Sequence, residues 1–317
     1  MNHIEGYALI EVRSDVGAGT EGAALGAQAI RAVAEQKGDT RFLNLDRVSL
    51  EFPNGSPLEE NQTPWAKHIV PLLKFQEKVA DEVYSAVHQG KFPVLLTGDH
   101  SSAIGIISGF KKAFADKNIG VVWIDAHADL HSPYTTPSGN LHGMPLAALI
   151  GEDNLEHQIH QPSETTEVCW KQMKNLAFPA PKFTGKDLVF VGVRSTETPE
   201  DKLIARHGIR KITVDDVRKS NGASIAQEVL ETLSHCDAIF VSFDVDSLDP
   251  SISAATGTPV DHGLNLEEVH DMMRVLLKDS RVKGLEVTEV NPTFEEDRTM
   301  ATAAYDVLLT ALTNHEH

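Results

Sequence analysis

The stretch "IGVVWIDAHADLH" (residues 119–131) joins an uninterrupted apolar run to four ionisable side chains at alternate positions. Its first half is typical of a strand that is buried on both faces of a parallel sheet, and we predict a strand over 119–127. Its second half carries Asp125, His127, Asp129 and His131. Because an isolated buried carboxylate is costly to keep charged, we hypothesise that a bound cation holds these side chains together.

Similar apolar runs recur along the chain and predict further strands at 7–12, 93–98, 187–194, 237–246 and 282–290. Between them, the spacing of apolar residues predicts helices over 63–89, 101–115, 200–207, 223–234, 265–278 and 298–313. This alternation predicts a three-layer α/β fold, in which helices cover both faces of a mostly parallel sheet. The segment 151–186 is polar and we expect it to be irregular. The strand rhythm resumes after it, so we expect a single domain over residues 1–317.

The composition has a strong acidic excess. Asp and Glu number 46 and Lys and Arg 28, which gives a net charge of −18. This balance disfavours nucleic acid and anionic membranes as partners, and it favours a cationic ligand or a metal. No apolar run reaches the roughly 20 residues of a membrane span, and residues 1–15 do not resemble a signal peptide, so we expect a cytoplasmic protein. Cys169 and Cys236 form no CxxC pair, and we interpret both as packing residues in a reducing compartment.

Ionisable side chains follow several predicted strands at their carboxyl ends, the edge at which parallel α/β sheets bind ligands. The candidate metal ligands are His100, Asp125, His127, Asp129, Asp244 and Asp246. Each alone has an ordinary structural explanation, such as capping a turn, but their combination at matching strand ends favours a metal site. Residues at i and i+2 of a strand share a face, so Asp125, His127 and Asp129 would point the same way if the strand continued through them.

The donor set indicates the number and kind of metal ions. Bridging carboxylates commonly hold two divalent cations roughly 3.5–4 Å apart, and four carboxylates would balance two such ions. Many oxygen ligands, two imidazoles and no thiolate suit Mn²⁺ better than a structural Zn²⁺ site, although Fe, Co or Ni fits the same set. A metal pair activates water at neutral pH. The pattern therefore predicts hydrolysis at an unreactive carbon or phosphorus centre.

The sequence resembles the ureohydrolase family, and the arginases most of all. The family's motifs appear in its order as "TGDHS" (97–101), "DAHADLH" (125–131), "SFDVDSLDPSISAATGTP" (242–259) and "EVTEVNP" (286–292). The stretch "SGNLHG" (138–143) is similar to the arginase loop that receives the amino-acid end of the substrate. The resemblance implies the fold of that family and a reaction in which L-arginine and water give L-ornithine and urea.

By this resemblance, the six candidate ligands would hold two Mn²⁺ ions per chain. One ion would be held by His100, Asp125, Asp129 and Asp244, and the other by Asp125, His127, Asp244 and Asp246. Asp125 and Asp244 would thus bridge. Asp129 would also orient the attacking water and act as the first proton acceptor.

The resemblance also assigns roles beside the metals. His142 would exchange protons with solvent, whereas on the residues alone it is an ordinary loop histidine; we favour the first interpretation because imidazole transfers protons near neutral pH. Glu289 would pair with the substrate's guanidinium, for which a carboxylate is a suitable bidentate partner. Thr258 would orient Glu289 or, alternatively, stabilise a turn.

The amino-acid end of the predicted pocket departs from the arginase pattern. Ser138 and Asn140 would bind the substrate's α-carboxylate, although both residues also favour turns. Glu197 would bind the α-amino group, with Glu200 as a second acid, and Ser195 stands where arginases carry a further aspartate. His131 replaces a usual asparagine, and its bulk would tighten the pocket or admit a different acid.

Several alternatives therefore stay open. Within the family, these are agmatinase, guanidinobutyrase and formimidoylglutamase activities. Outside it, they are a non-catalytic metal-stabilised binding protein and a deacetylase-like enzyme with one metal. The resemblance also implies a homo-oligomer, either a trimer or a hexamer.

Overall fold

The computed structural model describes residues 6–53 and 62–314. Its centre is an eight-stranded sheet with the order β2-β1-β3-β8-β7-β4-β5-β6, and every neighbouring pair is parallel. The strands are β1 (Tyr7–Arg13), β2 (Arg47–Glu51), β3 (Phe92–Thr97), β4 (Ile119–Ile124), β5 (Leu188–Val191), β6 (Arg210–Ile212), β7 (Ala238–Asp244) and β8 (Val282–Thr288). The predicted α/β fold is confirmed, and the sheet is parallel throughout.

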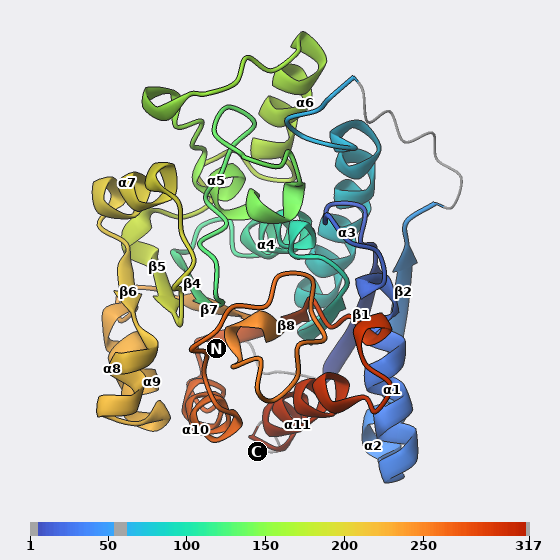
Figure 1. Ribbon diagram of the computed structural model, residues 1–317. Coiled ribbons are helices and arrows are strands. Elements are labelled where there is room, and N and C mark those ends of the chain that lie inside the picture. The colour runs from blue at the N-terminus through green and yellow to red at the C-terminus, as the bar shows by residue number, and fades with distance from the viewer. Residues whose placement is uncertain (1–5, 54–61, 315–317) are drawn as a thin grey trace.

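Helices cover both faces of this sheet (Figure 1). One face packs against α1 (Gly26–Lys37), α8 (Val214–Lys219), α9 (Gly222–Thr232), α10 (Leu266–Leu276) and α11 (Thr299–Asn314). The other packs against α3 (Ile69–His88), α4 (Ala103–Ala113), α5 (Pro145–Ile150) and α7 (Thr198–His207). The short α2 (Thr40–Leu43) adds Phe42 to the first core. The helix α6 (Glu164–Lys174) packs outside the second layer, against α3 and α5.

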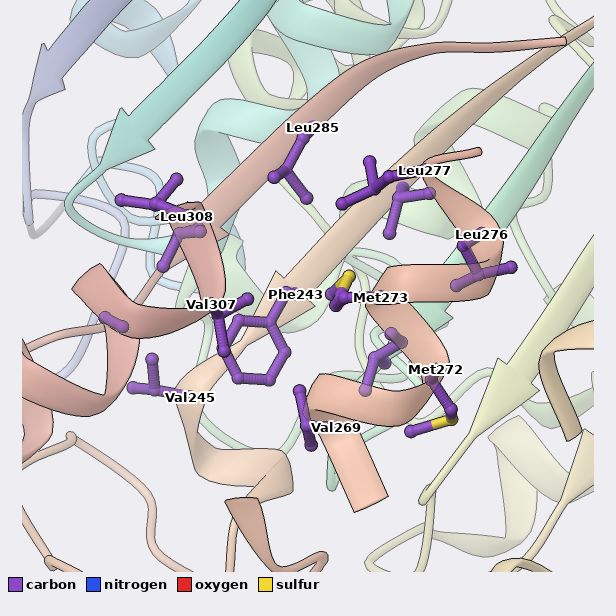
Figure 2. Close-up of a cluster of buried hydrophobic side chains, with 14 of the residues drawn as sticks. Phe243, Val245, Val269, Met272, Met273, Leu276, Leu277, Leu285, Val307 and Leu308 are labelled. Carbon is purple, nitrogen blue, oxygen red and sulfur yellow. The ribbon is translucent and has the colours of Figure 1, made fainter. Parts of the chain in front are cut away.

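The contact of α10 with the sheet shows how the apolar pattern produces this layering. Val269, Met272, Met273 and Leu276 recur at helical spacing and are all buried. In Figure 2, Val269 and Met273 lie beside Phe243 of β7, and Val307 of α11 lies on the other side of the ring. Each fully buried apolar side chain of this size stabilises the fold by about 1.5–3 kcal/mol. A capping box between Asn265 and Glu268 fixes where α10 begins.

The sequence pattern missed elements that bury little apolar surface. Most of β2 is exposed, and β6 has only 3 residues, so neither has an apolar run. The segment 151–186 was expected to be irregular, but it contains α6. Ser163 caps the start of this helix, because its side chain accepts a hydrogen bond from the backbone amide of Thr166. Within the described residues, none of the helices combines the length and apolar character needed to cross a bilayer. The single-domain organisation stays a prediction.

Candidate functional site

The candidate site lies at the carboxyl edge of the sheet, where β3, β8, β7 and β4 stand side by side. β4 ends at Ile124, so the predicted strand over 119–127 is too long. Asp129 has a φ of 50°, a conformation that non-glycine residues rarely adopt. The i, i+2 geometry of a continuing strand therefore does not align Asp125, His127 and Asp129. The loop after β4 brings them together instead.

His100 lies at the centre of one group of acidic side chains. Its Nδ1 atom is 3.1 Å from Asp125 Oδ2, 3.3 Å from Asp129 Oδ2 and 3.1 Å from Asp244 Oδ2. All four residues are buried. Nevertheless, His100 Nδ1 and Asp125 Oδ2 have no hydrogen-bond partner among the described residues. Buried polar atoms are rarely left unsatisfied, so this group has the donors of a cation site.

The other ring nitrogen of His100 fixes the tautomer. Ser242 donates its hydroxyl proton to Glu286 Oε2 over 2.9 Å, so its oxygen accepts from His100 Nε2 over 2.8 Å. The carboxylate of Glu286 is held in turn by the hydroxyl of Thr97 at 2.9 Å. The ring also stacks on Trp123, with centroids 3.9 Å apart. Burial opposes a charged ring, but Asp125, Asp129 and Asp244 hold the pKa of His100 well above its usual value. With a proton on Nε2, loss of the proton on Nδ1 to a metal would leave the lone pair that binds it.

A second group forms around His127. Its Nδ1 atom lies 2.9 Å from Asp246 Oδ2 and 3.6 Å from Asp125 Oδ1. Asp125 is therefore shared between the two groups. The donor atoms of His100, Asp125 and Asp129 lie within 4.8 Å of one another, as do those of Asp125, His127 and Asp246.

Backbone amides orient three of the aspartates. Asp125 Oδ1 accepts from the amide of His127 at 2.7 Å, and Asp244 Oδ1 accepts from the amide of Asp246 at 2.7 Å. Asp246 Oδ1 accepts from the amide of Ala126 at 3.1 Å. In each case Oδ2 lies within 3.1 Å of a histidine nitrogen. The backbone thus aims one oxygen of each carboxylate into the cluster.

The crowded charges shift the acidity of these side chains. Burial and the charge of Asp125 raise the pKa of Asp129 to about 7. Burial is also the largest cause that raises the pKa of Asp244 well above its usual value, and the negative charges of Asp246 and Asp125 add to it. Burial opposes a charged ring at His127, but Asp246 and Asp125 raise its pKa to about 12. Two divalent cations would balance the four carboxylates and displace the imidazole protons.

A cavity of about 210 Å³ opens above the cluster. Apart from Asp125, which lies beneath it, every predicted site residue lines this cavity: His100, His127, Asp129, His131, Ser138, Asn140, His142, Glu197, Glu200, Asp244, Asp246, Thr258 and Glu289. Segments more than 100 positions apart in the sequence thus converge on one polar pocket.

His142 and Glu289 form a pair on the pocket wall. Glu289 Oε1 lies 3.3 Å from His142 Nδ1 and accepts the amide of His100 at 2.9 Å. Burial alone would lower the pKa of His142, but Glu289 raises it to about 9. Glu289 is buried, with 3% of its surface exposed, whereas 19% of the His142 side chain is exposed. His142 therefore has access both to the pocket and to solvent.

At the far end of the pocket, neighbours fix the predicted substrate-binding residues. The side-chain oxygen Oδ1 of Asn140 accepts a hydrogen bond from Lys67 Nζ at 3.1 Å. The backbone amide of Asn140 donates to Ser138 Oγ at 3.1 Å. Glu197 and Glu200 form the capping box of α7, in which Glu200 accepts from the amide of Glu197 at 3.0 Å.

His131 lies against both of these glutamates. Its Nε2 atom is 3.4 Å from Glu197 Oε2 and 3.6 Å from Glu200 Oε2. Burial raises the pKa of Glu200 to about 7, and burial lowers the pKa of His131 although Glu197 opposes this. Glu197 and Glu200, which are predicted to receive the α-ammonium group of a substrate, thus already have His131 as a neighbour.

One predicted contact is wrong, and several supporting residues were missed. Thr258 donates to Asp246 Oδ2 at 3.2 Å and does not orient Glu289. Ser242 and Glu286, which fix the ring of His100, were not predicted as site residues. Glu286 is fully buried within β8, and a charged residue inside an apolar strand is a signal that identifies such a role.

Comparison with known proteins gives consistent results. Residues 5–313 match the family model described as the arginase family. The chain is 31% identical over 303 residues to the arginase of Bacillus subtilis, covering 95% of each chain. It is similar to the crystal structure of arginase from Bacillus caldovelox, with a TM-score of 0.84, 30% identity and 98% of each chain covered. The structure of Entamoeba histolytica arginase in complex with L-ornithine matches with a TM-score of 0.85, 25% identity and 98% of each chain covered.

Proposed function

The chain belongs to the arginase family, and on that premise we propose that it is a dimanganese hydrolase that converts L-arginine and water to L-ornithine and urea. The family's hydrolases act on guanidino C–N bonds, so the proposal concerns the metal and the substrate. The observation that carries it is the convergence of two imidazoles and four carboxylates beneath one pocket, with His100 Nδ1 and Asp125 Oδ2 left without partners.

The residues present fit two divalent ions. His100, Asp125, Asp129 and Asp244 would hold the first ion, and Asp125, His127, Asp244 and Asp246 the second. Oxygen donors predominate and no thiolate takes part, which favours manganese over a structural zinc. When bound, the two ions would supply a water that is ionised at neutral pH and would stabilise the charge that develops during attack.

The chain's own residues position the substrate and move the protons. Asp129 would accept a proton from the attacking water and return it to the leaving amine. Glu289 would accept hydrogen bonds from the guanidinium, because its other contacts, the His100 amide and His142, already fix its carboxylate. His142 would pass to solvent the proton that is released when the next water is ionised, since it is partly exposed and lies beside Glu289.

The far end of the pocket would bind the amino-acid part of the substrate. Lys67 donates a hydrogen bond to the side-chain oxygen of Asn140. The side-chain NH₂ of Asn140 and the Ser138 hydroxyl therefore remain as donors for an α-carboxylate. Glu197 and Glu200 would receive the α-ammonium.

A second candidate substrate follows from His131. Because its ring lies 3.4 Å and 3.6 Å from Glu197 and Glu200, an α-ammonium would compete with it for these carboxylates. A guanidino acid without an amine, such as 4-guanidinobutyrate, avoids that competition, and its carboxylate could accept a hydrogen bond from the His131 ring. Agmatine and formiminoglutamate are the other candidates within the family.

The experiment is to load the purified protein with Mn²⁺ and compare kcat/KM for L-arginine, agmatine, 4-guanidinobutyrate and formiminoglutamate. We expect L-arginine to be the best substrate. A strong preference for agmatine would refute the assignment, and a preference for 4-guanidinobutyrate would favour the second candidate. Release of no product from any of the four would revive a non-catalytic role. A cytoplasmic location and assembly into a trimer or hexamer also stay proposals, and light scattering of the purified protein would measure its assembly.

A further inference from the structure

A second cluster of metal-binding side chains lies away from the pocket. Asp187 ends the short 3₁₀ turn Gly185–Asp187 immediately before β5, and His235 and Cys236 lie just before β7, separated from it by one residue. Because β5 and β7 flank β4 and all three are parallel, these residues meet at the amino edge of the sheet, opposite the candidate active site. We propose that Asp187, His235 and Cys236 bind a thiophilic divalent ion, Zn²⁺ in the first instance.

The three donor atoms already lie close together. A carboxylate oxygen of Asp187, a ring nitrogen of His235 and the sulfur of Cys236 lie within 4.8 Å of one another. Asp187 Oδ1 is 2.7 Å from His235 Nε2 and 3.9 Å from Cys236 Sγ. A tetrahedral zinc ion with bonds of about 2.0–2.3 Å requires donors about 3.3–3.7 Å apart. The oxygen–sulfur separation is near that value, and the oxygen–nitrogen pair must open by roughly 0.6 Å.

The surroundings allow this adjustment. The His235 side chain is 47% exposed, so its ring can move outward without disturbing the core. The opposite oxygen of Asp187 accepts hydrogen bonds from the amide and the hydroxyl of Thr184, at 2.8 Å and 2.7 Å. Outer contacts of this kind orient a ligand and improve metal affinity. Solvent on the His235 side supplies a water as the fourth ligand.

The donor set separates this site from the catalytic one. Sulfur is a preferred ligand of zinc and a poor one for manganese, and the candidate active site has no cysteine. The nearby cation Arg281 is occupied by Asp279 and by the carbonyls of Leu233 and Leu230. Because Asp187 precedes β5 whereas His235 and Cys236 precede β7, a bound ion would link these two turns and stabilise this edge of the sheet.

Cobalt distinguishes the two sites, because only a thiolate ligand gives a sulfur-to-cobalt charge-transfer band in the near ultraviolet. We would strip the full-length protein of metal, keep it reduced, and titrate it with Co²⁺. We expect the absorbance of this band to rise until it corresponds to one thiolate–cobalt bond per chain. The band should disappear when Zn²⁺ is added in an amount equimolar with the Co²⁺. Cys169→Ser is the matched control, because it removes the other cysteine and should leave the band unchanged.

Two variants locate the ligands. Cys236→Ser should abolish the band, and the exposed position of His235 makes His235→Ala a variant that should fold normally and weaken Co²⁺ binding at this site at least tenfold. Circular dichroism of the metal-free variants checks their folding. Absence of the band in the parent protein, its persistence in Cys236→Ser, or undiminished Co²⁺ affinity in His235→Ala would overturn the proposal. The arginase assay is not needed for this test, so its outcome is independent of the proposed function.

Discussion

Replacing Ser242 with alanine tests whether the chain of side chains behind His100 prepares the metal site. The hydroxyl accepts from His100 Nε2 at 2.8 Å and donates to Glu286 Oε2 at 2.9 Å. Ser242→Ala removes both contacts and leaves the lone pair of His100 Nδ1 without a fixed direction. Loss of such an outer contact typically weakens metal binding by 10–100-fold, which corresponds to about 1.4–2.7 kcal/mol.

The same change should destabilise the metal-free protein. It leaves a buried ring N–H and a buried carboxylate oxygen without their partner, and each unsatisfied group costs about 1–3 kcal/mol. Ser108→Ala is a matched control, because Ser108 is equally buried and its hydroxyl has no hydrogen-bond partner among the described residues. It should leave metal affinity unchanged and reduce stability little.

The assay is a titration of metal-free protein with Mn²⁺, followed by activity and by calorimetry, alongside denaturant unfolding of the metal-free forms. We expect a weakened Mn²⁺ site in Ser242→Ala and a parental one in Ser108→Ala. If Ser242→Ala binds both ions as tightly as the parent protein, the assignment of a positioning role to Ser242 and Glu286 is refuted.

Three further predictions follow from the pocket. His131→Asn should raise kcat/KM for L-arginine relative to 4-guanidinobutyrate, because it removes the ring that lies against Glu197 and Glu200; an unchanged ratio in the substrate assay would contradict this. Burial raises the pKa of Glu200 to about 7, so the folded state binds its proton more tightly and the free energy of unfolding should fall by about 3 kcal/mol as pH rises from about 4.5 through 7. Glu200→Gln should flatten that part of the stability profile measured by denaturant unfolding, and an unaltered slope would show that Glu200 does not cause it. Removing the metals with a chelator should lower Tm, because the four buried carboxylates then repel one another, and added Mn²⁺ should restore it; equal Tm values with and without metal would contradict the fit of the cluster to cations.

The buried parts of the fold could be predicted because their signal is local. β3, β4 and β7 are buried along their whole length, so each appears as a continuous apolar run. By contrast, most of β2 is exposed, and it is held by pairing with β1. Its position depends on a neighbour that lies far away in the sequence, and no local pattern encodes that pairing.

The candidate site shows a different limit. The structure brings the predicted residues together around one pocket. For Asp125 to Asp129 the predicted cause of this convergence was wrong, since a loop with a left-handed residue replaces the extended strand. Distances between side chains were also inaccessible, as Thr258 shows by contacting Asp246. The contacts of His131 could not be predicted from the sequence, because they depend on α7, which places Glu197 and Glu200 beside the ring.

The central claim is that two metal ions lie between His100 and His127 and share Asp125 and Asp244. Anomalous diffraction at the manganese absorption edge, from crystals grown with Mn²⁺, measures this directly. The account predicts two peaks per chain at this cluster, each beside one of the two histidines. A single peak there, or none at saturating Mn²⁺, would contradict it.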